Sequence, residues 1–263
     1  MHLKMTLLNR RWLAIIVLPV LTCFSQMAMA ECVKTMRWSD DRPFTFIDKS
    51  SSEIKGISVD IATEALKRLD CNISFKKLPW ARALEELRLG RIDLISGAYR
   101  KPEREVYALF STQGLLSPNV LFLRADNLGK WQFNELAEMP SKGFRLGTQI
   151  NVSYSEEYDR LKQNAQFAKI LYPQSNRVSL WRMLKMNRID GVIADTITGR
   201  QELNDLNMSG QIKASDFIVS NAPSYFAFSK ATTQQSFVQS FDNVVVKMKA
   251  EGLFDKIEKH YLD

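Results

Sequence analysis

The chain has 263 residues, of which 45% are hydrophobic and 25% charged, and its formal net charge is +7. The basic residues are dispersed and no nucleic-acid-binding module is recognisable, so we expect no nucleic-acid partner. Of the two histidines, His2 lies in the N-terminal segment described next and His260 lies near the C-terminus. Because histidine is the usual general base and the commonest metal ligand, we expect no Ser-His-Asp or Cys-His catalytic group, no metal site and no cofactor.

Residues 1–30 have the composition of a secretory signal peptide. Basic residues without any acid precede an apolar run over 12–24, and a small-x-small cleavage site ends at Ala30. A membrane anchor is the alternative, but the run is short for a span that needs about 20 residues. Cys23 raises the further alternative of a lipoprotein, although threonine precedes it where such signals usually place Gly, Ala or Ser. We expect a cleaved chain that begins at Glu31 and resides in the periplasm.

Two cysteines remain after this cleavage. Cys32 opens an expected strand at 33–38, and Cys71 opens another at 72–78. If these strands are parallel neighbours, their starts lie side by side, and an oxidising compartment favours a disulfide between the two cysteines. Two buried free thiols are the alternative, and no Cys-x-x-Cys redox or zinc spacing is present.

Beyond residue 30 the chain keeps 33 basic and 29 acidic residues and alternates between strand and helix patterns. Expected strands or extended segments are 33–38, 72–78, 92–98, 119–124, 144–149, 168–172, 189–194 and 217–228. Expected helices begin at Gly56 or cover 80–89, 102–109, 131–138, 154–164, 178–187, 196–205 and 233–261. Two of the extended segments, 119–124 and 217–228, are interpreted as crossings between two lobes. This divides the chain into a first lobe (31–124), a second lobe (125–216) and a return to the first lobe (217–263).

A nine-residue pattern supports the two lobes, because residues 87–95 return with similar sequence at 184–192. In both copies a helix stops at Gly90 or Asn187, residue types that tolerate a left-handed C-terminal cap, and an Arg-Ile-Asp step leads into an apolar strand. Strands fed by helices in this way form parallel sheets, whose ligands lie beyond the carboxyl ends of the strands. The alternative is a chance echo between two ordinary helix–turn–strand units.

Four segments carry a resemblance to one protein family. They are Gly56 to Ile61, Gly97 to Arg104 followed by Phe110-Ser111, Ile189 to Asp195, and Met248 to Tyr261. With them, residues 31–263 resemble the bacterial extracellular solute-binding proteins of family 3. The resemblance implies a two-lobed α/β fold of the type II periplasmic-binding-protein kind, with a mainly parallel sheet flanked by helices in each lobe. It also implies a ligand cleft between the lobes and delivery of polar amino acids to the permease of an ABC transporter.

The resemblance places a carboxylate-binding arginine at Arg104, beside Tyr99 and Ala98. Pro102 suits the first position of a helix, whose start offers free N–H groups to an anion, and the planar guanidinium of Arg104 matches a carboxylate. A surface salt bridge to a neighbouring glutamate is the alternative role for Arg104. Asp195 is expected to bind an ammonium group, or alternatively to be a plain helix N-cap.

Other expected ligand contacts depart from the family pattern. Trp80 and Arg82 follow the second strand, where Trp80 is either a cleft wall or ordinary core. Residues 151–153 read Asn-Val-Ser where relatives carry Gly-Thr-Thr or Gly-Thr-Ser, so Ser153 either contacts the ligand or starts a helix through a capping box. Asp41 falls near the position of a ligand-stacking aromatic in relatives.

Three functions are consistent with these residues. The leading interpretation is a monomeric transport receptor that captures an amino acid or related carboxylate without chemistry. The first alternative is a periplasmic enzyme on the same fold, like the cyclohexadienyl dehydratases that resemble these receptors, with Asp41, Lys101 or Tyr99 moving protons. The second is a sensor that presents its ligand-bound form to a membrane receptor.

Overall fold

The first of two five-stranded sheets has the strand order β4–β1–β5–β12–β6. The computed structural model of the protein describes residue 2 and residues 31–262, so the expected signal peptide lies outside the described residues apart from residue 2. The strands are β1 (Cys32–Trp38), β4 (Cys71–Lys77), β5 (Leu94–Ala98), β6 (Ala108–Leu115) and β12 (Ser224–Ser229). β4, β1 and β5 run parallel, while β12 is antiparallel to both β5 and β6. Five helices belong with this sheet: α1 (Ile57–Lys67), α2 (Trp80–Arg88), α3 (Pro102–Glu105), α8 (Gln235–Ala250) and α9 (Leu253–Leu262).

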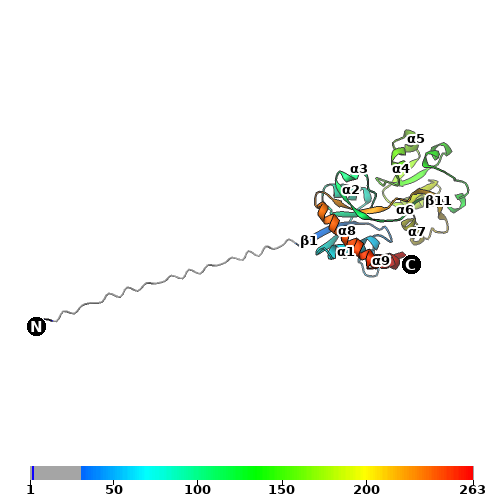
Figure 1. Ribbon diagram of the computed structural model, residues 1–263. Coiled ribbons are helices and arrows are strands. Elements are labelled where there is room, and N and C mark those ends of the chain that lie inside the picture. Colours follow the sequence, from blue (N-terminus) through cyan, green and yellow to red (C-terminus); the bar gives the residue numbers. More distant parts are fainter. Residues whose placement is uncertain (1, 3–30, 263) are drawn as a thin grey trace. The chain divides into compact units, whose positions relative to one another are not determined.

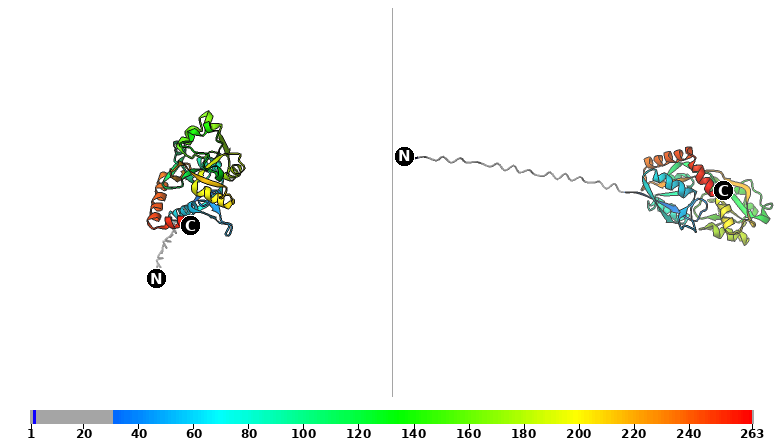
Figure 2. Two further views of the ribbon diagram at one scale, coloured as in Figure 1. Left: turned by 90° about the vertical axis from the view of Figure 1, so that its right-hand side faces the viewer. Right: turned by 90° about the horizontal axis from the view of Figure 1, so that it is seen from below.

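The helices of the first sheet divide between two apolar cores. One core joins α1, α8 and α9 to the sheet through residues such as Ile61, Leu94 and Phe241. In the views of Figures 1 and 2, α8 and α9, orange to red, lie close to the blue and cyan elements. The other core joins α2 to β5 and β12 through Leu87 and Ile95. The C-terminal helices α8 and α9 therefore pack in the same core as the N-terminal elements β1 and α1.

The second sheet has the order β11–β7–β10–β8–β9. Its strands are β7 (Asn119–Arg124), β8 (Leu146–Gln149), β9 (Leu171–Gln174), β10 (Gly191–Asp195) and β11 (Ile212–Ser220). α6 (Arg177–Lys185) and α7 (Thr196–Asp205) contribute to one of its cores, and α4 (Glu156–Leu161) and α5 (Ala165–Ala168) to the other. Three short 3₁₀ turns, Ala125–Asn127, Leu136–Glu138 and Pro140–Lys142, connect β7 to β8. β2 (Phe46–Ile47) and β3 (Ile54–Lys55) form a separate two-stranded ribbon.

The two sheets confirm the expected type II fold class, but each sheet is mixed rather than mainly parallel, with two parallel and two antiparallel strand pairings. The crossings also fall elsewhere than expected. Residues 119–124 form β7, which is antiparallel to both β10 and β11 inside the second sheet. Five of its six residues are buried, as an apolar strand needs when both faces of its sheet are covered. β11 likewise belongs to the second sheet as far as Ser220. The chain therefore crosses at 116–118 and 221–223, several residues from the expected boundaries after 124 and 216.

Other expected elements differ in length or type. The expected helix 102–109 ends at Glu105, because Ala108 begins β6 and pairs with β12. The expected helix 131–138 is wrong apart from a 3₁₀ turn, since Trp131 and Phe133 instead pack their rings against Phe144. The expected C-terminal helix is interrupted at Gly252, whose φ of +70° lies in the left-handed region that favours glycine.

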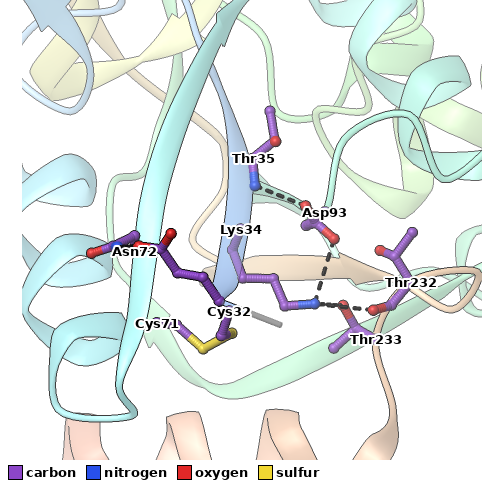
Figure 3. The surroundings of a disulfide bond; sticks show 9 residues. Cys32, Lys34, Thr35, Cys71, Asn72, Asp93, Thr232 and Thr233 are labelled. Carbon is purple, nitrogen blue, oxygen red and sulfur yellow. Dashed lines mark hydrogen bonds and ion pairs between the residues drawn. A yellow bond between two sulfur atoms is a disulfide. The ribbon is translucent and has the colours of Figure 1, made fainter. Parts of the chain in front are cut away.

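The repeated nine-residue pattern performs the same structural task in both sheets. Gly90 and Asn187 both have positive φ, as the expected caps require. In the first copy the carboxylate of Asp93 accepts the backbone N–H of Thr35 at 2.7 Å, as Figure 3 shows. In the second copy the carboxylate of Asp190 accepts the backbone N–H of Arg145 at 2.9 Å. Each aspartate therefore connects the start of its own strand to an earlier strand segment by a hydrogen bond. The repeated sequence pattern is thus explained by its role in sheet assembly, not by ligand binding.

The expected disulfide joins Cys32 to Cys71 (Figure 3), and the alternative of two free thiols is wrong. The two cysteines face each other in the parallel register of β1 and β4, with Cα atoms 4.6 Å apart. This geometry lies within the ordinary range for a disulfide. The bond fastens β4, the outermost strand on this side, to β1.

The first prediction concerns this bond. Cys32→Ser/Cys71→Ser should lower the free energy of unfolding by about 3–4 kcal/mol, because the bond restricts a loop of 39 residues in the unfolded chain. Urea denaturation of the oxidised protein and of the double variant measures the difference. Reducing agent should destabilise the wild type by a similar amount and leave the variant unchanged. Equal midpoints for wild type and variant would contradict the prediction.

Candidate functional site

A cavity of about 150 Å³ is lined by residues from both sheets. Arg37 lies in β1, Ser96 in β5, Gln149 in β8 and Ala194 in β10, each at or near the carboxyl end of a strand. Ligands of α/β proteins bind at these ends. An apolar cavity of this size accommodates a molecule about as large as benzene, so the space suits one small ligand.

Arg104 is a buried cation that has no ion-pair partner in the described part of the chain. The turn from β5 into α3 places it in the cavity wall, and only 7% of the residue is exposed. Its Nη1 donates to the backbone oxygen of Tyr99 at 3.0 Å, and no carboxylate among residues 31–262 lies within 4 Å of its guanidinium. Burial lowers the pKa of Arg104 from its ordinary value, but an arginine stays protonated in proteins. A buried charge is costly without a partner, so Arg104 is suited to an anion on the ligand.

The helix start beside Arg104 contributes less than expected. Pro102 is the first residue of α3, as predicted, but α3 has four residues only. The N–H groups of Arg104 and Glu105 both donate to the backbone oxygen of Lys101. The case for an anion at this position therefore rests on the guanidinium of Arg104.

Asp195 ends β10 and is the N-cap of α7. Its Oδ1 accepts the backbone N–H of Thr198 at 2.8 Å and the hydroxyl of Ser117 at 2.9 Å. The N-cap role is confirmed, and the same side chain lines the cavity. Within the described part of the chain, no lysine or arginine forms an ion pair with Asp195, and both hydrogen bonds use one oxygen. The other oxygen is thus available to a cation on the ligand.

Asp41 belongs to a network that joins the two sheets. It follows β1 and accepts Nη1 of Arg37 at 2.9 Å and Nη2 of Arg177, at the start of α6, also at 2.9 Å. Burial alone would raise the pKa of Asp41, but Arg37 and Arg177 lower it to about 2. Arg177 also donates from Nε to both oxygens of Glu202 and from Nη1 to Gln149. Asp41 is therefore an ionised partner of protein cations at neutral pH.

Trp80 forms a wall of the cavity. Its ring lies 5.6 Å from the guanidinium carbon of Arg37 and 5.8 Å from that of Arg104, within the range of cation–π attraction. Its Nε1 donates across the cavity to the backbone oxygen of Asn151 at 3.2 Å. The structure shows both expected roles, because Trp80 lines the cavity and is also packed, partly buried, against the core between α2 and the first sheet.

Tyr99 and Ser153 line the cavity through hydrogen-bonded hydroxyl groups. The Tyr99 hydroxyl accepts Nδ2 of Asn119, and burial raises the pKa of Tyr99. Ser153 donates to Asp159, which also pairs with Lys101 across the cleft at 2.5 Å. The capping box expected for Ser153 is wrong, because the helix N-cap is Ser155, whose hydroxyl accepts the N–H of Tyr158.

Six of the eight expected contact residues line the cavity, and two do not. The side chain of Arg82 is 58% exposed and pairs with Glu86 at 2.6 Å on the surface of α2. Ala98 is fully buried in the core between α2 and the first sheet. Sequence reasoning missed Arg37 and Arg177. A charged residue between Met36 and Trp38 in an apolar strand is a signal for Arg37, whereas nothing distinguishes Arg177 from other helix-start arginines.

The described residues contain no group of three His, Cys, Asp or Glu side chains placed to hold a metal ion. Nor does any helix within 31–262 combine the length and apolar character that crossing a membrane requires. The polar chemistry of the cavity is thus carried by arginine, carboxylate, hydroxyl and amide groups.

The fold, the cavity between two sheets and its charged residues define a solute-binding protein of two α/β lobes. The family of bacterial extracellular solute-binding proteins, family 3, matches residues 36–263, and the chain belongs to it. L-cystine-binding protein TcyA of Bacillus subtilis (strain 168) is 26% identical over 221 residues, which cover 83% of this chain and 76% of that protein.

Solved structures share the fold at low sequence identity. A histidine kinase sensor domain with similarity to periplasmic binding proteins superposes with a TM-score of 0.75 at 15% identity, covering 89% of this chain and 96% of that one. An ancestral arginine-binding protein bound to arginine has a TM-score of 0.74 at 21% identity, covering 89% of this chain and all of that one (100%). At these identities the likeness establishes the fold and leaves the ligand to be argued from the site.

Proposed function

We propose that the protein is a periplasmic receptor that captures a small α-amino acid in the cleft and delivers it to an ABC importer. One observation carries the ligand class: the cavity presents a buried cation, Arg104, and an anion, Asp195, and neither has an oppositely charged partner within 31–262. An α-amino acid supplies a carboxylate and an ammonium group together. Related proteins that bind cystine or arginine support the class without naming this protein's ligand.

A calorimetric screen tests the ligand class. The protein should be unfolded and refolded to remove any retained molecule, then titrated with amino acids, small dicarboxylates and sugars. We expect the tightest binding from an amino acid. A best ligand without a carboxylate would overturn the proposal, and so would a best ligand that carries a carboxylate but no amine.

The enzymatic alternative lacks a suitable proton carrier among the three residues expected for it. Asp41 has a pKa of about 2 and is bound by two arginines, so it is a weak base. Burial raises the pKa of Tyr99, which makes its hydroxyl a poorer acid. Lys101 pairs with Asp159. A general acid or base works best when its pKa lies near the operating pH, and the pKa shifts of Asp41 and Tyr99 lead away from that condition.

A transport receptor differs from a sensor in that it delivers its ligand to a permease, so uptake of the ligand distinguishes the two functions. Uptake of the identified ligand should fall in cells that lack the protein and return when it is supplied on a plasmid. Unchanged uptake, with loss of a ligand-dependent response instead, would favour the sensor.

The second prediction concerns export. Protein recovered from the periplasm should begin at Glu31 and carry no lipid, because the apolar run and the cleavage site ending at Ala30 have the form of a signal peptide. Intact mass and N-terminal sequencing measure both properties. Replacing Ala30 by a bulky residue should slow processing and leave the precursor with its full N-terminus. A lipid on Cys23 would contradict this prediction.

A further inference from the structure

Besides Arg104 and Asp195, the cavity is lined by charged residues of the network around Asp41. Two of its members, Arg37 and Asp41, belong to the first sheet and its following loop, and two, Arg177 and Glu202, belong to helices of the second sheet. Arg37, Asp41 and Arg177 line the cavity, while Glu202 lies behind Arg177. The network therefore joins the two sheets along the wall of the cavity.

Each side-chain nitrogen of Arg37 and Arg177 already donates a hydrogen bond to the protein. Arg37 donates from Nε to the backbone oxygen of Leu78, from Nη1 to Asp41 and from Nη2 to Ser39. Every nitrogen of this guanidinium therefore has an acceptor.

Arg177 is equally engaged. Its Nε donates to Glu202, its Nη1 to Gln149, and its Nη2 to both Asp41 and Glu202. Arg104 differs from both arginines, because the protein engages only its Nη1. Of the five N–H groups of each guanidinium, the protein engages three in Arg37, four in Arg177 and one in Arg104, so Arg104 keeps the most donors for a ligand.

The charges of the network also cancel. Asp41 is held between two guanidinium groups, and Glu202 accepts Arg177 and the indole N–H of Trp181 at 2.6 Å. Burial raises the pKa of Glu202, and Arg177 opposes that effect. With two guanidinium groups and two carboxylates, this wall is neutral, whereas the Arg104 and Asp195 positions each carry an uncompensated charge.

We infer that Asp41 is a specificity-determining residue: it pairs with Arg37 and Arg177 and neutralises this wall, so that the cleft selects amino acids with uncharged side chains. The inference rests on the proposed function. The carboxylate and ammonium groups of the ligand would take the charges of Arg104 and Asp195, so an ionised side chain would meet only charges that are already paired, and an unpaired buried charge is expensive. A neutral side chain meets no such penalty and can contact the apolar walls, Phe44, Leu115, Val152 and Tyr154.

The test compares the wild type with Asp41→Ala across the twenty standard amino acids by calorimetry. For the wild type, the tightest ligand should have an uncharged side chain, and each charged amino acid should bind at least about tenfold more weakly. Asp41→Ala removes the carboxylate and leaves an empty space where it was. Arg37 and Arg177 then lose their shared carboxylate partner, and this wall carries an unpaired positive charge. The affinity of glutamate or aspartate relative to the best neutral ligand should then rise at least about tenfold, which corresponds to about 1.4 kcal/mol.

Two further variants sharpen the test. Asp40→Ala is the matched control: the side chain of Asp40 is 64% exposed, contacts Arg42 and lies outside the cavity wall, so its ligand ranking should equal that of the wild type. Glu202→Gln removes the other negative charge from the opposite sheet and should shift the ranking in the same direction as Asp41→Ala. It provides the result if Asp41→Ala does not fold, as judged by circular dichroism.

The outcomes separate this inference from the proposed function. If no amino acid binds the wild type, the proposed function fails. If amino acids bind but one with a charged side chain binds most tightly, the specificity inference alone is overturned. An unchanged ranking in the folded Asp41 and Glu202 variants also overturns it.

Discussion

Arg104→Ala should weaken binding of the amino-acid ligand by about thirtyfold or more. The guanidinium is buried, engages the protein through Nη1 only and has no paired carboxylate within 31–262. Truncating one partner of a buried charge pair costs about 2–5 kcal/mol, and about 1.4 kcal/mol corresponds to tenfold in affinity. Calorimetric titration with the best ligand of the wild type measures the loss.

Arg100→Ala is the matched control, because Arg100 lies four residues earlier, is exposed and pairs with Glu105 away from the cavity. It should bind the ligand as the wild type does. The fold of Arg104→Ala should survive, since an unpaired buried cation contributes little to stability, and thermal unfolding checks this. If Arg104→Ala binds with unchanged affinity, the carboxylate position is wrong.

Much of the fold could be predicted because local patterns and long-range contacts agree. Helix 196–205 was expected with the bounds that the structure shows, and the cysteine pair was placed by the starts of two parallel strands. Where they disagree, tertiary pairing prevails. Residues 106–109 continue a helical pattern, but Ala108 pairs with β12 and belongs to a strand. Propensity cannot reveal a partner strand more than 100 residues away.

In the candidate site, too, local sequence features predict some residues, while others depend on tertiary contacts. Arg104 and Asp195 could be selected from the sequence because each lies near the carboxyl end of an expected strand, where α/β proteins bind ligands, and mostly because the resemblance to family 3 implies a carboxylate-binding arginine and an ammonium-binding aspartate at these positions. Arg177 could not, because its role depends on contact with Asp41, which is 136 residues away in the chain. Asp41 was expected from its position alone, and its ionised state became evident only with its two arginine partners. Single positions were thus predictable, but the charge balance of the cleft required the assembled sheets.

Asp195→Asn should also weaken binding by about thirtyfold or more, while leaving the free energy of unfolding nearly unchanged. Asparagine caps helices about as well as aspartate, so its side-chain oxygen can keep the contacts with Thr198 and Ser117. The variant therefore removes the negative charge without removing the cap. Asp195→Ala removes both, and should lose about 1 kcal/mol of stability in addition to affinity.

A ligand analogue isolates the proposed ammonium contact. The same compound without its amine should bind the wild type and Asp195→Asn equally, because the lost charge then has no partner on the ligand. The amino acid itself should lose most of its advantage over this analogue in the variant. Asp205→Asn, which changes an exposed aspartate at the other end of α7, serves as the control and should bind both compounds as the wild type does. Equal losses for both compounds in Asp195→Asn would show that Asp195 acts by shaping the cleft and that the amine binds elsewhere.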